Sequence, residues 1–155
     1  MHVMTKYLDT RKAAIKALQD YPVMENAANT PEETASEARQ LREDLAAPAS
    51  AKLDGMPRNP DPHAGQARIA ATLDRIDLLN QREIQARQYL AWFLPAWEVI
   101  SEDDQYVLEN FFLGEGSQDE RVAMISDHFY IERDSVYRRK NRALDRLAVA
   151  LYGRV

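Results

Sequence analysis

Cysteine is absent from this chain of 155 residues, and glycine and histidine are scarce, with five and three copies. Without cysteine there is no disulfide framework, no thiolate metal site and no cysteine nucleophile. The histidines, His2, His63 and His128, lack the spacing of metal ligands. The sequence has neither a glycine-rich phosphate loop nor a Gly-x-Ser-x-Gly nucleophile motif. We therefore expect a protein that is not an enzyme and has no catalytic residues, metal or cofactor.

Long hydrophobic runs are missing as well. The strongest apolar stretch, from Tyr89 to Trp97, is far shorter than the roughly 20 residues that cross a bilayer. The first six residues contain no apolar signal core. We therefore expect a cytoplasmic protein that does not contact membranes.

The sequence also lacks the alternation of apolar and polar residues that marks a half-buried strand. Apolar residues recur instead at steps of three or four, and this pattern predicts an all-α fold. It predicts a helix over 4–20 that is interrupted at Tyr21-Pro22, because proline disfavours helix in the residue before it. A second helix is predicted from Pro31 to about Ala47. Segment 1–47 is thus interpreted as an N-terminal helical hairpin.

Residues 48–65 form the clearest predicted linker, since they hold four of the seven prolines and two of the five glycines. A long helix is predicted over 66–94, within a segment 66–97, and we expect Pro95 to end or kink it. Its apolar stripe could be the seam of a coiled coil, so we expect a homo-oligomer formed through this helix. The stripe comprises Ile69, Leu73, Ile76, Leu79, Ala86, Leu90 and Phe93.

The C-terminal segment, 98–155, has the layout of a helix-turn-helix. Ser101 begins one predicted helix, and Ser117 caps a second one over 118–128. A bend at 129–131 leads to a basic last helix from about Arg133 to Tyr152. In this layout the last helix lies in the DNA major groove. The expected buried positions are Val107, Leu108, Phe111, Phe112, Val122, Ile125, Phe129, Val136, Ala143, Leu144, Leu147 and Leu151.

The charge distribution favours nucleic acid even though the net charge of −5 does not. The last 24 residues contain seven basic and three acidic residues, a net charge of +4, so the other 131 carry −9. Phosphate attraction is local, because salt screens it beyond roughly 8–10 Å. The alternative is that these arginines only solvate the outer face of a terminal helix.

The stretch 101–151 resembles region four of sigma-70-type transcription factors. The residues that carry this resemblance are Val107-Leu108, Ile125-Ser126, Tyr130-Ile131-Glu132, Val136 and Ala143-Leu144-Asp145-Arg146-Leu147. The whole chain is similar to the RinA/ArpU family of phage-encoded transcriptional regulators, through Asp20-Tyr21-Pro22 and Leu41-Arg42-Glu43-Asp44 as well. This resemblance implies a sigma-like helix-turn-helix after a helical N-terminal region, and activation of late phage or prophage genes.

Two positions depart from the family pattern. Tyr130 stands where the bend has glycine, and Glu132 stands where the last helix has a Ser or Thr cap. If the bend needs a positive φ, the tyrosine costs on the order of 1 kcal/mol. Glu132 could still cap the helix, but its charge would lie near DNA phosphates.

The candidate DNA-binding residues lie on the last helix and at the start of the one before it. On a wheel of about 100° per residue, Asp134, Arg138, Asn141 and Arg142 lie opposite the apolar face. We expect Arg138 to read a base, because a guanidinium can donate two hydrogen bonds to guanine. Residues suited to phosphates are Ser135, Arg139, Arg142 and the amides of Ser117 and Gln118. The resemblance implies base contacts by Arg133, Asp134, Tyr137 and Arg138.

We therefore expect a sequence-specific DNA-binding transcriptional regulator, with double-stranded DNA as partner and RNA polymerase as a further candidate. A second hypothesis is an acidic helical adaptor that binds RNA polymerase or another phage protein without reading DNA. A third is a phage packaging subunit, although such subunits usually place the helix-turn-helix first.

Overall fold

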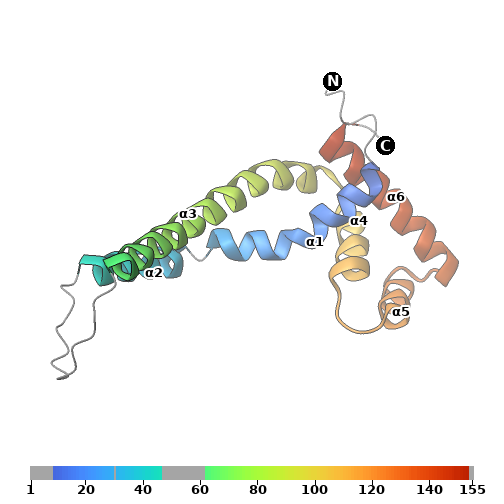
Figure 1. Ribbon diagram of the computed structural model, residues 1–155. Coiled ribbons are helices and arrows are strands. Elements are labelled where there is room, and N and C mark those ends of the chain that lie inside the picture. Colours follow the sequence, from blue (N-terminus) through green and yellow to red (C-terminus); the bar gives the residue numbers. More distant parts are fainter. Residues whose placement is uncertain (1–8, 30, 47–61, 154–155) are drawn as a thin grey trace. The chain divides into compact units, whose positions relative to one another are not determined.

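The structure, a computed structural model, describes residues 9–29, 31–46 and 62–153. This part of the chain is all-α and contains no strand, which confirms the predicted fold class (Figure 1). The elements are α1 (Thr10–Asn29), α2 (Pro31–Ala46), α3 (Pro62–Val99), α4 (Glu102–Leu108), the π-helical turn η2 (Glu109–Leu113), α5 (Gln118–Phe129) and α6 (Arg133–Tyr152). The predicted bounds of α2, α5 and α6 agree with these to within one residue.

The structure differs from the sequence-based expectations at three prolines. Helix α1 continues through Pro22 to Asn29 instead of breaking at Tyr21-Pro22. Helix α3 begins at Pro62, inside the predicted linker 48–65, and passes Pro95 to end at Val99. The remainder of that linker and the predicted start of the first helix, 4–8, lie outside the described residues.

Helices α1 and α3 pack against each other next to Pro22 of α1. The ring of Tyr21 stacks on Phe93, with centroids 5.2 Å apart, and the Tyr89 hydroxyl donates a hydrogen bond to the Ala17 carbonyl. These contacts hold the part of α1 that precedes Pro22 against α3. Pro95 and Ala91, the residue four positions before it, are both exposed, so the carbonyl that proline leaves unbonded is open to water.

The described chain divides into two compact units, which are taken in turn. The first comprises the described residues of 1–24 and 88–155. Its larger apolar cluster joins α1, the end of α3, α4 and α6 around Leu18, Phe93, Leu108 and Leu147. A smaller cluster joins α4, η2, α5 and α6 and consists of Val107, Phe111, Val122, Ile125 and Val136. Helix α6 contributes to both clusters and is therefore fixed at both of its ends.

The π-helical turn connects these two clusters. Phe111 belongs to the smaller cluster, and the neighbouring Phe112 packs against both. In an α-helix, consecutive side chains point about 100° apart. A π-turn inserts an extra residue into the helix, and here consecutive phenylalanines both pack against the apolar interior.

The second unit comprises Glu25–Arg87, of which 47–61 and Thr30 are not described. Ala38 of α2 and Ile76 and Ala86 of α3 are buried in it. Arg75 donates a hydrogen bond of 2.6 Å to Glu37. Ile69 and Leu73, which belong to the predicted apolar stripe of α3, are about half exposed, as is the nearby Ile84.

A tight left-handed turn joins α5 to α6. The amide of Ile131 donates to the Ser126 carbonyl at 3.1 Å, and the amide of Tyr130 donates to the Asp127 carbonyl. This pair of bonds is the Schellman motif, which requires a left-handed residue at the helix end. Tyr130 occupies that position with φ 53° and ψ 46°, where glycine is the favoured residue. The side chain of Tyr130 is 95% exposed, so no packing offsets the strain.

Replacing Tyr130 by glycine should therefore stabilise the protein. The left-handed conformation costs a non-glycine residue about 1–2 kcal/mol, and the greater freedom of glycine in the unfolded chain cancels part of the gain. We expect Tyr130→Gly to raise the free energy of unfolding by about 1 kcal/mol in urea titrations. Tyr130→Ala removes the same ring but keeps the strain, so an equal gain in that variant would contradict this explanation.

Candidate nucleic-acid interface

Helix α6 presents an apolar face to the interior and a polar face to solvent. The buried positions are Val136, Ala143, Leu144, Leu147, Ala148 and Leu151, which include every residue of this helix expected inside. At about 25 cal/mol per Å² of buried apolar surface, such a face fixes the rotation of the helix about its axis. The opposite face must therefore point outward.

The outward face carries an open hollow of about 500 Å³ in the first half of α6. Its lining consists of four of the predicted DNA-binding residues, Ser135, Arg138, Asn141 and Arg142. Arg138, Asn141 and Arg142 are exposed, and Ser135 is half-buried. Within the described part of the chain, neither Arg138 nor Arg142 forms an ion pair. Both guanidinium groups are thus available to an anionic partner.

Two other predicted arginines are held by acids from neighbouring helices. Arg133 donates to the Asp119 carboxylate at 3.0 Å, and both side chains are exposed. Arg139 donates to Asp103 at 2.7 Å, and its guanidinium carbon lies 3.8 Å from the centre of the Phe129 ring. With only 27% of its side chain exposed, Arg139 is largely committed to packing the first unit.

The aromatic and lysine side chains of α6 also pack inward. Tyr137 meets Phe111 edge to face, with centroids 5.9 Å apart. The ammonium group of Lys140 lies 4.8 Å from the centre of the Phe111 ring, an arrangement in which the ring quadrupole attracts the cation. Burial, together with the nearby Arg11 guanidinium, lowers the pKa of Lys140. Because its ammonium group lies over the Phe111 ring, Lys140 is placed away from the outward face.

The start of α5 is closed by its own capping box. The Ser117 hydroxyl accepts a hydrogen bond from the Glu120 amide at 3.3 Å, and the Glu120 carboxylate accepts one from the Ser117 amide at 2.8 Å. These bonds lower the pKa of Glu120. The Ser117 amide, which we expected to bind phosphate, is therefore already engaged, while Gln118 is exposed beside it.

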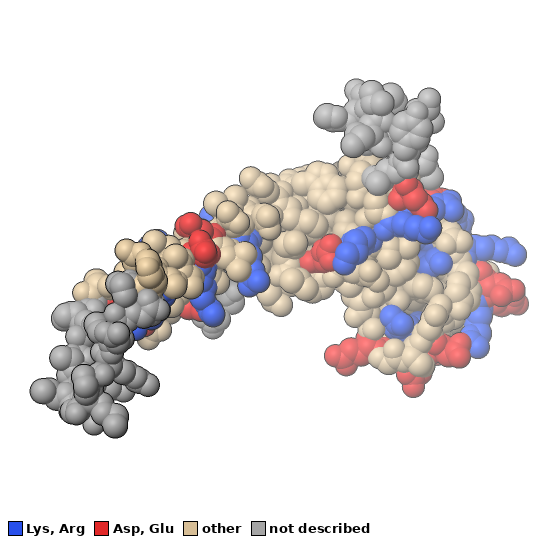
Figure 2. Space-filling model, viewed as in Figure 1, with Lys and Arg blue, Asp and Glu red and all other residues tan. Residues whose placement is uncertain are grey.

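The start of α6 has no comparable cap. Glu132 occupies the cap position with φ −68° and ψ 155°, but its side chain makes no capping hydrogen bond. Asp134 and Glu132 are exposed here. Figure 2 shows acidic side chains interspersed with the basic ones at the edge of the molecule where α6 lies in Figure 1. The interface is therefore a mixed surface rather than an unbroken basic patch.

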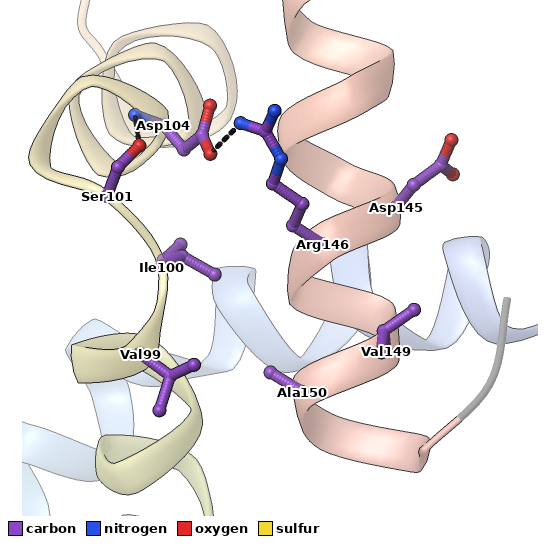
Figure 3. Close-up of a pocket in the computed structure, with 8 residues that line it drawn as sticks. All are labelled: Val99, Ile100, Ser101, Asp104, Asp145, Arg146, Val149 and Ala150. Carbon is purple, nitrogen blue, oxygen red and sulfur yellow. Dashed lines mark hydrogen bonds and ion pairs between the residues drawn. The ribbon is translucent and has the colours of Figure 1, made fainter.

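The second half of α6 borders a different, largely apolar groove of about 490 Å³ (Figure 3). Val99 and Ile100 line it from the end of α3, and Val149 and Ala150 line it from α6. Val99 is 79% exposed.

An ion pair between α4 and α6 closes one side of this groove. Asp104 accepts a hydrogen bond from Arg146 and has only 4% of its side chain exposed. Asp145, which also lines this groove, accepts a hydrogen bond from Arg11 of α1 at 2.7 Å. These two pairs connect α6 to α4 and α1. Asp103 and Asp104 lie in the first turn of α4, where acids are usual, and no local sequence pattern links them to arginines some 40 positions later.

Among the described residues, no cluster of three or more His, Cys, Asp or Glu side chains is placed to hold a metal ion. None of the described helices combines the length and hydropathy of a membrane span. No family model, curated protein or solved structure matches the chain.

The neighbouring acids of α4 offer a matched test of what holds α6. The Asp104 carboxylate is buried and accepts a charge-assisted hydrogen bond, so Asp104→Ala should lower the free energy of unfolding by about 1.5–3 kcal/mol. Asp103 is 62% exposed, and Asp103→Ala should cost less than about 1 kcal/mol. Urea unfolding of the two variants measures both values. Equal losses would show that burial of Asp104 does not matter.

Proposed function

We propose that the protein is a sequence-specific DNA-binding regulator of transcription that uses α5 and α6 as a sigma-region-four-like helix-turn-helix. One observation carries the proposal. The arginines of α6 are paired with acids at its flanks, whereas Arg138 and Arg142, on the outward face, are exposed and have no ion-pair partner in the described structure. Unpaired guanidinium groups on the outward face of a second helix are suited to DNA in the major groove.

The first half of α6 would enter the groove. A helix of 20 residues is about 30 Å long, whereas the major groove is about 12 Å wide, so only part of α6 can lie between the phosphate strands. Arg138 is suited to guanine and Asn141 to adenine. Arg142 is suited to a backbone phosphate, which positions the protein without reading sequence.

The resemblance described above adds three base contacts to this proposal, by Arg133, Asp134 and Tyr137. Arg133 would have to leave Asp119 to reach a base, and Tyr137 would have to use the part of its ring that Phe111 does not cover. Arg139 would help chiefly by holding the helix in place, since Asp103 and Phe129 already occupy its guanidinium.

We further propose that the regulated genes are late phage or prophage genes and that the protein acts as an oligomer. The oligomer would form through α3, where Ile69, Leu73 and Ile84 are exposed. At about 100° per residue these three positions fall within about 60° of one another on the helix. An exposed apolar stripe of this kind favours association with a second helix.

The adaptor hypothesis keeps one specific observation in its favour. The groove between Val99 and Val149 exposes apolar side chains. It lies at the end of α6, the part of the helix that would extend beyond the DNA. Such a groove could accept an apolar side chain from RNA polymerase or another protein. An adaptor that uses only this groove would not bind DNA, and the following experiment therefore separates the two functions.

A shift assay at controlled salt, on duplexes selected from a random pool by the wild-type protein, tests the proposal. Arg138→Ala should weaken binding to the selected duplex by about 1–3 kcal/mol and relax the preference at one base pair. Arg142→Ala should weaken selected and scrambled duplexes alike and reduce the salt slope by about 1. Lys16→Ala, which removes an exposed cation of α1, is the control and should bind as the wild type does.

Wild-type affinity in both arginine variants would contradict the proposed docking face. Failure of the wild-type protein to select any duplex would favour the adaptor.

A further inference from the structure

The ion pair between Arg133 and Asp119 lies where the proposed DNA-reading surface begins. Asp119 is in the first turn of α5, and Arg133 is the first residue of α6. One terminal nitrogen of Arg133 lies 3.0 Å from the Asp119 carboxylate and 3.4 Å from its carbonyl oxygen. The side chains are 58% and 85% exposed, so water and a phosphate oxygen can both reach the pair. An exposed pair of this kind is worth only about 0–1 kcal/mol and can exchange partners.

The charges around this pair are acidic. Glu132 and Asp134 flank Arg133 along the chain, and both are exposed. Three acidic residues, Asp119, Glu132 and Asp134, therefore accompany a single arginine at the start of these helices. The free cations, Arg138 and Arg142, lie one or two turns further along α6. The start of α6 would therefore repel phosphate while Arg133 is paired with Asp119.

We infer that Asp119 is a specificity-determining residue, because it withholds Arg133 from phosphates and releases it only to a base edge. This inference rests on the proposed DNA-binding function and adds a mechanism of discrimination to it. In a non-specific complex Arg133 stays with Asp119 and adds no phosphate contact. In a specific complex the loss of this weak pair is offset by a two-bond contact to a base, worth about 1–3 kcal/mol. The pair is broken only in the specific complex, because only the correct sequence offers Arg133 a contact that offsets the loss.

A purely structural role for Asp119 makes a different prediction. An acid in the first turn of a helix stabilises it through the helix dipole, and Asp119→Asn would then lower the free energy of unfolding slightly. Such a change would not alter how DNA binding depends on salt, because that dependence counts the phosphates neutralised. The salt slope therefore separates the two roles.

The test compares Asp119→Asn with the wild type on a scrambled duplex and on the selected duplex. Freed Arg133 should add about one phosphate contact on the scrambled duplex, which steepens the salt slope by about 0.9. When salt is lowered fourfold, from about 200 to 50 mM, the affinity of Asp119→Asn should therefore rise about threefold more than that of the wild type. The selected duplex should gain less, so the ratio of selected to scrambled affinity should fall.

Glu98→Gln is the matched control, since it removes one exposed carboxylate without touching this pair. Glu98 is far from Arg133, because it precedes Val99, and Val99 lines the groove next to Val149. Val149 is 16 positions from Arg133 on the same helix, about 24 Å at 1.5 Å per residue. Glu98→Gln should leave the salt slope and the affinity ratio at their wild-type values.

A second background shows whether the effect runs through Arg133. In Arg133→Gln the further change Asp119→Asn should no longer steepen the slope. If Asp119→Asn steepens the salt slope equally in that background, Asp119 acts only by repelling phosphate, and the inferred control of Arg133 by Asp119 is wrong. If wild-type protein binds DNA but Asp119→Asn leaves slope and ratio unchanged, the inference is overturned while the proposed function stands. If the wild type binds no duplex, both are overturned.

Discussion

Burial of the aliphatic side of α6 is the constraint on which the rest of this structure depends. Val136 at one end and Leu147 at the other belong to different apolar clusters, so the helix can neither rotate nor tilt without exposing one of them. The polar side is then outward by necessity. Arg138 and Arg142 owe their exposure to this burial rather than to any contact of their own, and the proposed function rests on that exposure.

The same helix also shows how a protein with net negative charge can present a small cationic surface. Acids from α4 and α5 pair with the arginines at the flanks of α6, through Asp103, Asp104 and Asp119. Among the arginines of α6 that the structure describes, Arg138 and Arg142 remain without an ion-pair partner, and both lie on the outward face. Because salt screens charges beyond roughly 8–10 Å, such local pairing matters more for an approaching phosphate than the total of −5. Discrimination between DNA sequences would then depend on which of the paired arginines leaves its acidic partner to contact a base.

Local sequence rules succeeded where one helix turn decides the outcome and failed where distant packing decides it. The cap at Ser117 and the first residue of α6 follow from side chains within a few positions of each other. The sequence predicted strain at Tyr130 if the bend required a positive φ. The observed φ of 53° meets that condition, so the strain is present. In contrast, α1 is not interrupted at Pro22, and α3 does not end at Pro95. The proline penalty of a few kcal/mol is outweighed at Pro95, where Phe93 before it and Ala96 after it share one core.

By itself, the sequence determined the all-α class, the bounds of α5 and α6 to within one residue, and all the buried side chains of α6 except Ala148. It could do so because helical periodicity and capping are local properties. It also determined which residues could face outward on that helix. Only the tertiary structure decided which of these are free, since the partners of Arg133 and Arg139 lie 14 and 36 positions away in the chain. Charge pairing at such separations depends on how helices pack, and no spacing rule within a single helix contains that information.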